Sequence, residues 1–169
     1  MSQIQLAELN EAEKDRFVDA LGSVYEESPW VARRSWSERP FRSVEELRAA
    51  MRRTVAAASE EEQLALLRAH PDLGEQTEMT DASEAEQSSA GLDELRPAQY
   101  ETFQRLNDRY RGKFGFPFIM AVTDATPEGI QTVMKRRIEN SESEEFQTAL
   151  DEVHEIARLR LEDLLVDAP

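Results

Sequence analysis

The sequence predicts an all-α fold, a multi-helix bundle in a single domain of residues 1–169. Capping residues stand before apolar residues that recur every three or four positions, which is typical of amphipathic helices. Prolines stand where the first turn of a helix is expected. The helical signals follow one another closely and leave little room for strands. At this length the chain buries a substantial core without disulfides or metal ions.

The first half of the chain predicts three helices, each opened by a capping pair. The pairs are Asn10 with Glu13, Ser43 with Glu46, and Ser59 with Glu62. The third helix is expected to end at His70, because Pro71 disfavours the helical conformation in the residue before it. Residues 28–41 contain two tryptophans and a proline near each end, which predicts an ordered loop with aromatic anchors.

The second half predicts three more helices. Pro97 suits the first turn of a helix that ends at Gly112. Thr126 and Pro127 open the next one, and Ser143 opens a long last helix that runs from about residue 144 to 165.

Residues 114–122, FGFPFIMAV, interrupt this helical pattern. The segment is apolar on all sides, and Pro117 disfavours a regular helix. We therefore expect it to be buried and extended or irregular. Its backbone N–H and C=O groups then need partners, and a polar ligand lying against the segment is one way to supply them.

The composition excludes several kinds of site and partner. The absence of cysteine and the presence of only two histidines exclude disulfides, thiolate nucleophiles, sulfur-ligated metals and a three-histidine metal site. A net charge of -15 opposes nucleic-acid binding. No membrane span or secretory signal is recognisable, so we expect a cytoplasmic protein. The acidic, lysine-poor composition suggests a host with a salty cytoplasm, where screening relieves self-repulsion.

Two neighbouring segments suggest a site. His70 lies in RAHPDLG at a predicted helix end, where it can face a cleft. Ser83, Glu86 and Gln87 share one face of the next helix, so a proton donor, a carboxylate and an amide can converge on one small polar ligand. Structural interpretations remain open, because a histidine can interact with a helix dipole and S-x-x-E is itself a capping box.

Arg160 occupies an unexpected position in the last helix. It falls in the apolar row between Ala157 and Leu164. Because burying an unpaired cation is costly, we expect it to meet a carboxylate, a ligand anion or water, and snorkelling is an equal alternative. His154 lies beside this row and is interpreted as structural.

Five motifs in order resemble the 2-oxo-4-hydroxy-4-carboxy-5-ureidoimidazoline (OHCU) decarboxylase family. They are ESPWVARRSW, AHPDLG, TDASEAEQSSAGL, YRGKFGFPFIMAV and IARLRLEDLL, and the resemblance covers the chain from about Phe17 onward. It implies an all-α homodimer without metal or organic cofactor. It also implies a lyase of purine catabolism that decarboxylates the unstable last intermediate of urate oxidation to (S)-allantoin. The stretch between AHPDLG and S-x-x-E-Q looks shorter than in some relatives.

The resemblance also implies roles for residues. His70 is the catalytic histidine, which can donate a proton as general acid near neutral pH, and Pro71 shapes the pocket beside it. Glu86 orients the substrate and can sustain a protonated histidine, while Arg160 suits a carboxylate or carbonyl group. The remaining substrate-binding residues are Ser83, Gln87, and the main-chain groups of Phe118, Ile119, Met120, Ala121 and Val122.

Two other functions remain open. The chain can be an acidic helical interaction module in which the polar residues are caps and the apolar segment is core or interface. Such a module has no need for Arg160 in an apolar row. The chain can also be a hydrolase in which His70 and Glu86 activate water for attack on a related ureide.

Overall fold

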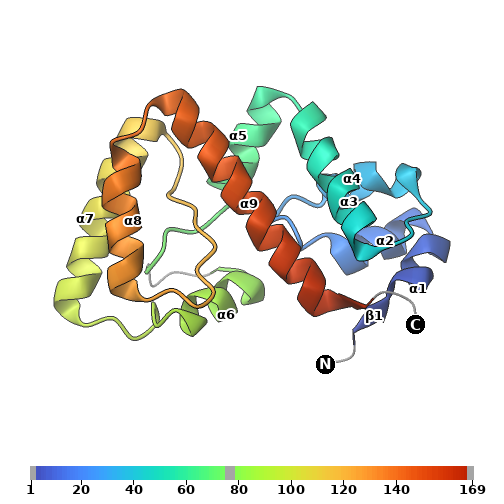
Figure 1. Ribbon diagram of the computed structural model, residues 1–169, viewed down its shortest axis with the longest axis horizontal. Coiled ribbons are helices and arrows are strands. Elements are labelled where there is room, and N and C mark those ends of the chain that lie inside the picture. Colours follow the sequence, from blue (N-terminus) through green and yellow to red (C-terminus); the bar gives the residue numbers. More distant parts are fainter. Residues whose placement is uncertain (1–2, 75–78, 167–169) are drawn as a thin grey trace. The chain divides into compact units, whose positions relative to one another are not determined.

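The computed structural model describes residues 3–74 and 79–166 and confirms the all-α prediction. Within these residues the only strands are two short ones that form a parallel pair. The elements are β1 (Ile4–Gln5), α1 (Leu6–Glu11), α2 (Lys14–Leu21), α3 (Trp30–Ser35), the 3-10 helix η1 (Trp36–Glu38), α4 (Val44–Ala57), α5 (Glu60–Arg68), α6 (Asp81–Ser89), α7 (Pro97–Phe114), α8 (Pro127–Ile138), α9 (Glu142–Leu164) and β2 (Leu165–Val166). Figure 1 shows α9 as one continuous helix.

The chain forms two compact units. The first contains Met1–Ala69 with His154–Pro169, and the second contains His70–Val153. That the whole chain is a single domain stays a prediction. In the part of the chain that the structure describes, no helix is both long and apolar enough to cross a membrane.

The first unit packs α1–α5 around an apolar core. α3 packs against both α2 and α4. Two of the predicted helix starts are confirmed here: Ser43 Oγ accepts the N–H of Glu46, and Ser59 forms a complete capping box with Glu62. The core side chains of this unit that are almost fully buried include Leu9, Phe17, Leu21, Val31, Leu47, Met51, Val55, Leu66 and Leu67.

Two predictions for the first unit are wrong. Asn10 is not a cap, since it lies inside α1, where its amide accepts the N–H of Phe41 at 2.7 Å and donates to that residue's carbonyl at 2.8 Å. Residues 28–41 are not a loop but mostly α3 and η1, because Pro29 has a helical φ of −63° and starts the helix instead of breaking it. The aromatic anchor is confirmed: Trp36 Nε1 donates to the Ala12 carbonyl at 3.0 Å.

The second unit packs α7 and α8 side by side, as Figure 1 shows. Pro97 opens α7 and Thr126 caps α8, both as predicted. The predicted end of α7 at Gly112 is wrong, because the helix continues to Phe114 and ends at Gly115, whose φ of 80° is left-handed. The buried core of the second unit includes Phe103, Leu106, Tyr110, Ile130 and Met134.

The last helix begins two residues earlier than predicted. α9 starts at Glu142, and Ser141 Oγ accepts the N–H of Glu144 at 3.2 Å. Ser141 therefore takes the capping role that was expected of Ser143. The helix ends at Leu164, one residue before the predicted end.

Two glycines of the second unit should respond oppositely to replacement by alanine. A Cβ on Gly112 would meet no atom within 4 Å, so Gly112→Ala is expected to raise the free energy of unfolding by about 0.5–1 kcal/mol through helix propensity. Gly74 has a φ of +79°, and a Cβ there would lie 3.0 Å from Leu95 Cδ1. Gly74→Ala is therefore expected to lower the free energy of unfolding by about 1 kcal/mol or more. Urea unfolding of both variants checks these signs, and stabilisation by Gly74→Ala would contradict the left-handed turn.

Candidate active site

His70 lies directly after the end of α5, as the sequence predicted. The helix ends at Arg68, Ala69 follows in a helical conformation, and the chain then bends into Pro71. The His70 side chain is buried, with 7% of its surface exposed. A buried imidazole at a bend is well placed for proton transfer to a bound molecule rather than to bulk solvent.

The turn that follows, Asp72–Gly74, is held by side chains from two helices. Gln87 on α6 accepts the Gly74 N–H at 2.9 Å and donates to the Asp72 carbonyl at 3.3 Å. From α7, Asn107 Nδ2 donates to the Leu73 carbonyl at 3.0 Å and Arg111 pairs with the Asp72 carboxylate at 2.7 Å. Sequence reasoning found Gln87 but missed the two residues of α7.

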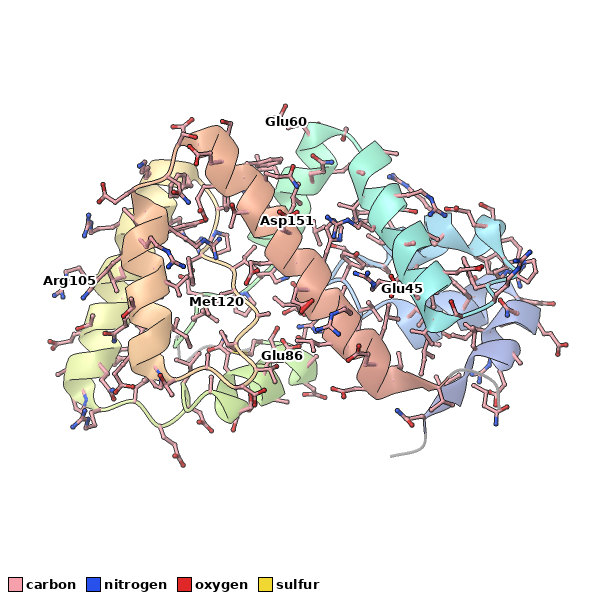
Figure 2. The ribbon with its side chains drawn as sticks, viewed as in Figure 1. Glu45, Glu60, Glu86, Arg105, Met120 and Asp151 are labelled. Carbon is pink, nitrogen blue, oxygen red and sulfur yellow. The ribbon has the colours of Figure 1, made fainter. Side chains whose placement is uncertain are left out.

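The polar face of α6 is confirmed, and its capping interpretation is wrong. Thr80 is the N-cap, and its hydroxyl accepts the N–H of Ser83 at 3.2 Å. Ser83 therefore lies within the first turn of the helix and is not its cap. Ser83 and Gln87 are buried and Glu86 is half-buried, so these three side chains share one inward edge of α6. Figure 2 labels Glu86 on this helix.

The two hydrogen bonds of Gln87 link this face of α6 to the Asp72–Gly74 turn that follows His70. They bring α6 against residues 72–74, two to four positions after His70. Gln87 thus joins α6 to the turn after His70 within the second unit, and the convergence of His70, Ser83 and Glu86 on one ligand stays a prediction. Both polar groups of the Gln87 amide contact the protein itself, whereas the resemblance assigned this side chain to the substrate.

The segment predicted as buried and irregular, residues 114–122, is so from Phe116 onward, whereas Phe114 is the last residue of α7 and Gly115 is exposed. Phe118, Ile119 and Val122 are buried, while Met120, which is labelled in Figure 2, and Ala121 are half-buried. Part of the backbone is satisfied by protein side chains. The Ile119 carbonyl accepts from Arg137 Nη1 at 2.7 Å, and the Ala121 N–H donates to Glu152 Oε1 at 3.0 Å.

A buried ion pair that sequence reasoning missed holds this segment. Arg137 Nη2 lies 2.6 Å from Glu145 Oε2, and the side chains are only 6% and 0% exposed. Tyr110 donates its hydroxyl to the same carboxylate, and the Arg137 guanidinium lies 4.4 Å from the centroid of the Phe118 ring. Burial, and then the hydrogen bond to Glu145, raise the pKa of Tyr110 well above its usual range.

A signal for this pair was present in the sequence. On α8, Arg137 follows the buried Ile130 and Met134 at helical spacing and therefore falls in their apolar row. Arg160 was singled out because it also lies in an apolar row. Arg137 was overlooked because it belongs to a run of basic residues at the end of α8. Glu145 was hidden in the same way among the acidic residues that open α9.

Arg160 belongs to the first unit, whereas His70, α6 and residues 118–122 belong to the second. Arg160 Nη1 donates to the Ser23 carbonyl at 3.0 Å and lies 3.3 Å from Glu26 Oε1. The expectation that this cation meets a carboxylate is confirmed. In the same unit, His154 Nδ1 lies 2.7 Å from the Tyr25 hydroxyl, which supports its structural interpretation.

Comparisons with known proteins agree with each other. A family model described as OHCU decarboxylase matches residues 10–162. The chain is 64% identical, over 98% of its length, to a protein of Halalkalicoccus jeotgali named 2-oxo-4-hydroxy-4-carboxy-5-ureidoimidazoline decarboxylase, and covers 94% of it. A protein of the same name from Haloferax volcanii is also 64% identical over 95% of the chain, which covers 96% of that relative.

Two solved structures have similar folds. A crystal structure of (S)-allantoin synthase superposes with a TM-score of 0.76 at 31% identity, covering 96% of this chain and 54% of that one. An OHCU decarboxylase crystallised in the presence of (S)-allantoin superposes with a TM-score of 0.71 at 23% identity, covering 90% of this chain and 98% of that one. The second likeness shows the fold alone.

Proposed function

Because the chain belongs to the OHCU decarboxylase family, we propose that it acts as a carboxy-lyase that needs no cofactor and uses His70 as its general acid. Its reaction is the decarboxylation of 2-oxo-4-hydroxy-4-carboxy-5-ureidoimidazoline to (S)-allantoin and carbon dioxide, the last step of urate oxidation. The observation that carries the residue assignment is the pair of Gln87 bonds, which join the polar face of α6 to the turn after His70.

The chemistry matches the residue types. When the bond to the carboxylate breaks, its electron pair stays on the ring carbon, next to nitrogen and carbonyl groups that can delocalise it. Delocalisation places this pair on the neighbouring ring carbon, which bears the ureido group, while the carbon that carried the carboxylate becomes a carbonyl. The ureido-bearing carbon must then take up one proton on one face to give a single enantiomer. An imidazole with an ordinary pKa of about 6.5 can donate that proton near neutral pH. His70 is buried in the bend, so its proton reaches the ring from one direction.

Glu86 and Ser83 suit substrate binding in complementary ways. The half-buried Glu86 carboxylate accepts N–H groups of the ureido arm and, when close to His70, favours the protonated imidazole. The buried Ser83 hydroxyl supplies a neutral hydrogen bond. Both side chains project from the same edge of α6, and Pro71 shapes the adjoining wall.

The main-chain groups of residues 118–122 form the second proposed contact surface. Two of them already have protein partners, the Ile119 carbonyl and the Ala121 N–H. The Ile119 oxygen keeps a second lone pair, and the other main-chain groups of this segment offer further donors and acceptors. That Arg160, which belongs to the first unit and pairs with Glu26, contacts a carboxylate or carbonyl group of the substrate stays a prediction from the resemblance.

The wider setting is proposed from the family and the composition. We place the protein in the cytoplasm as a homodimer, with a small ureide as its partner and without a nucleic-acid or membrane partner. The net charge of -15 supports the exclusion of nucleic acid.

The reaction is tested by generating the intermediate in situ from urate with the two preceding enzyme activities. We expect optically active allantoin to appear faster than the spontaneous decay, as followed by circular dichroism, with carbon dioxide released in equal amount. Racemic product at the spontaneous rate would favour the interaction module. Consumption of substrate without carbon dioxide would favour the hydrolase.

A further inference from the structure

Asn107 has a position that the proposed chemistry does not explain. It lies on the buried face of α7 with Phe103 and Tyr110, where the helical pattern calls for an apolar residue. Its side chain is 5% exposed, and its Nδ2 donates to the Leu73 carbonyl at 3.0 Å. On the same helix, Arg105 is exposed and points outward in Figure 2.

The side-chain amide of Asn107 has a free-energy cost at this buried position. Within the described residues, Asn107 Oδ1 is buried and has no hydrogen-bond partner. An unsatisfied buried acceptor costs about 1–3 kcal/mol, a cost that leucine at this position would avoid. The residue therefore tolerates one lost hydrogen bond in order to supply one donor to the turn, which indicates that this donor matters.

The turn depends on such bonds because it is not packed on all sides. A cavity of about 170 Å³ adjoins it, lined by Asp72, Leu73 and Gly74 on one side and by Gln104, Asn107 and Asp108 of α7 on the other. On that side, the packing of the described residues around the turn is incomplete. The Arg111 pair with Asp72 is partly exposed, with the arginine side chain 51% exposed, and such pairs contribute little.

A movement of the Asp72–Gly74 turn also moves His70, because the two are close neighbours in the chain. Only Pro71 and Asp72 separate His70 from Leu73, and the proline ring fixes one of the intervening backbone dihedrals. The short, stiff connection means that a shift of the Leu73 carbonyl reorients the imidazole. A displacement of about 1 Å at a catalytic group can cost about 10²-fold in rate.

We propose that Asn107 is a positioning residue that holds His70 in its proton-donating orientation through the Leu73 carbonyl. This inference rests on the proposed function, in which His70 is the general acid. It predicts that the loss of the donor lowers kcat and leaves KM nearly unchanged, because Asn107 touches the turn and not the substrate.

The test replaces the donor with one that pH controls. In Asn107→Asp the carboxylate repels the Leu73 carbonyl, whereas the protonated acid can donate to it. Burial and the neighbouring Asp72 and Asp108 raise the pKa of the new carboxyl group, and Arg111, already paired with Asp72, opposes that rise. Gln104→Glu is the matched control, since it makes the same chemical change on the same cavity wall, three residues earlier on α7.

With wild type measured at every pH as the reference, kcat of Asn107→Asp should fall about 10²-fold at pH 8 and recover as the pH falls toward 5.5, with KM changing less than about threefold. Asn107→Leu should stay slow throughout, and Gln104→Glu should match wild type. Urea unfolding confirms that each variant is folded. Unchanged kcat, a loss that lies in KM, or no recovery at low pH would overturn the positioning role.

His70→Ala, assayed in parallel, separates this inference from the proposed function. If that variant still forms optically active allantoin at the wild-type rate, the assignment of the general acid fails and the inference falls with it. If His70→Ala is inactive while Asn107→Asp keeps its kcat, only the positioning role fails.

Discussion

His70→Ala is expected to slow the enzymatic formation of (S)-allantoin by about 10²–10⁴-fold, the usual contribution of a general acid. The physical reason is that the variant has no group in the bend to protonate the ring carbon after the carboxylate leaves. Substrate will still decay spontaneously, so the loss appears in the optical activity of the product more clearly than in the consumption of substrate.

The measurement is the initial rate of the circular dichroism signal, corrected for the spontaneous reaction. The chain offers its own control in His154, whose Nδ1 lies 2.7 Å from the Tyr25 hydroxyl. His154→Asn should lower stability by about 1–3 kcal/mol, because a buried hydrogen bond is lost, but should keep the enantiomeric purity of the product. Equal losses of optical activity in both variants would argue against a specific role for His70.

Glu145→Gln is expected to lower the free energy of unfolding by about 3–5 kcal/mol, the largest stability effect that we predict. It leaves the guanidinium of Arg137, whose side chain is 6% exposed, buried without a counter-charge. It also weakens the network in which Tyr110 donates to the carboxylate and Arg137 holds the Ile119 carbonyl. Urea unfolding followed by circular dichroism measures the change.

Two comparisons make this prediction specific to a buried charge. The double variant Arg137→Met with Glu145→Leu should lose less stability than the sum of its single changes, because neither residue then leaves a lone charge. Glu38→Gln breaks an exposed pair with Arg53, in which the arginine and glutamate side chains are 63% and 39% exposed, and should cost under about 1 kcal/mol. Similar costs for Glu38→Gln and Glu145→Gln would show that burial does not decide the effect.

The fold class was predictable because local signals agreed with the tertiary structure. Ser43 and Ser59 cap helices where the sequence placed them, and Pro97 opens a third. The errors arose where a local signal has two structural uses. Asn10 has the side chain of a cap but bonds to Phe41 far along the chain, and Gly112 can interrupt a helix but here lies within one.

The candidate site was only partly predictable from the sequence. His70, Ser83 and Gln87 stood out because their spacing places polar groups on a helix end and on one helix face. Nothing local could reveal that Gln87 bonds to the turn at Asp72 and Gly74, because the partners are backbone groups more than ten residues away.

The residues that support the site were harder to find than the site itself. Asn107 and Arg137 each occupy an apolar row of a helix, which was a usable signal. Their partners are a carbonyl of the histidine turn and the carboxylate of Glu145, and only the tertiary structure pairs them. A polar residue in an apolar row therefore indicates that a partner exists, without identifying it.

The parallel pairing of β1 and β2 has a consequence for engineering. Ile4 lies opposite Leu165 and Gln5 opposite Val166, so both ends of the described chain lie on the same small sheet. Neighbouring strands are about 4.8 Å apart, and an extended residue spans about 3.3 Å. Because the two strands are parallel, a linker from Val166 back to Ile4 must reverse direction twice, and such a connection needs about a dozen residues or more to leave the pair undisturbed. The chain is thus suited to circular permutation, in which new ends are opened in an exposed loop and the connectivity changes while the packing does not.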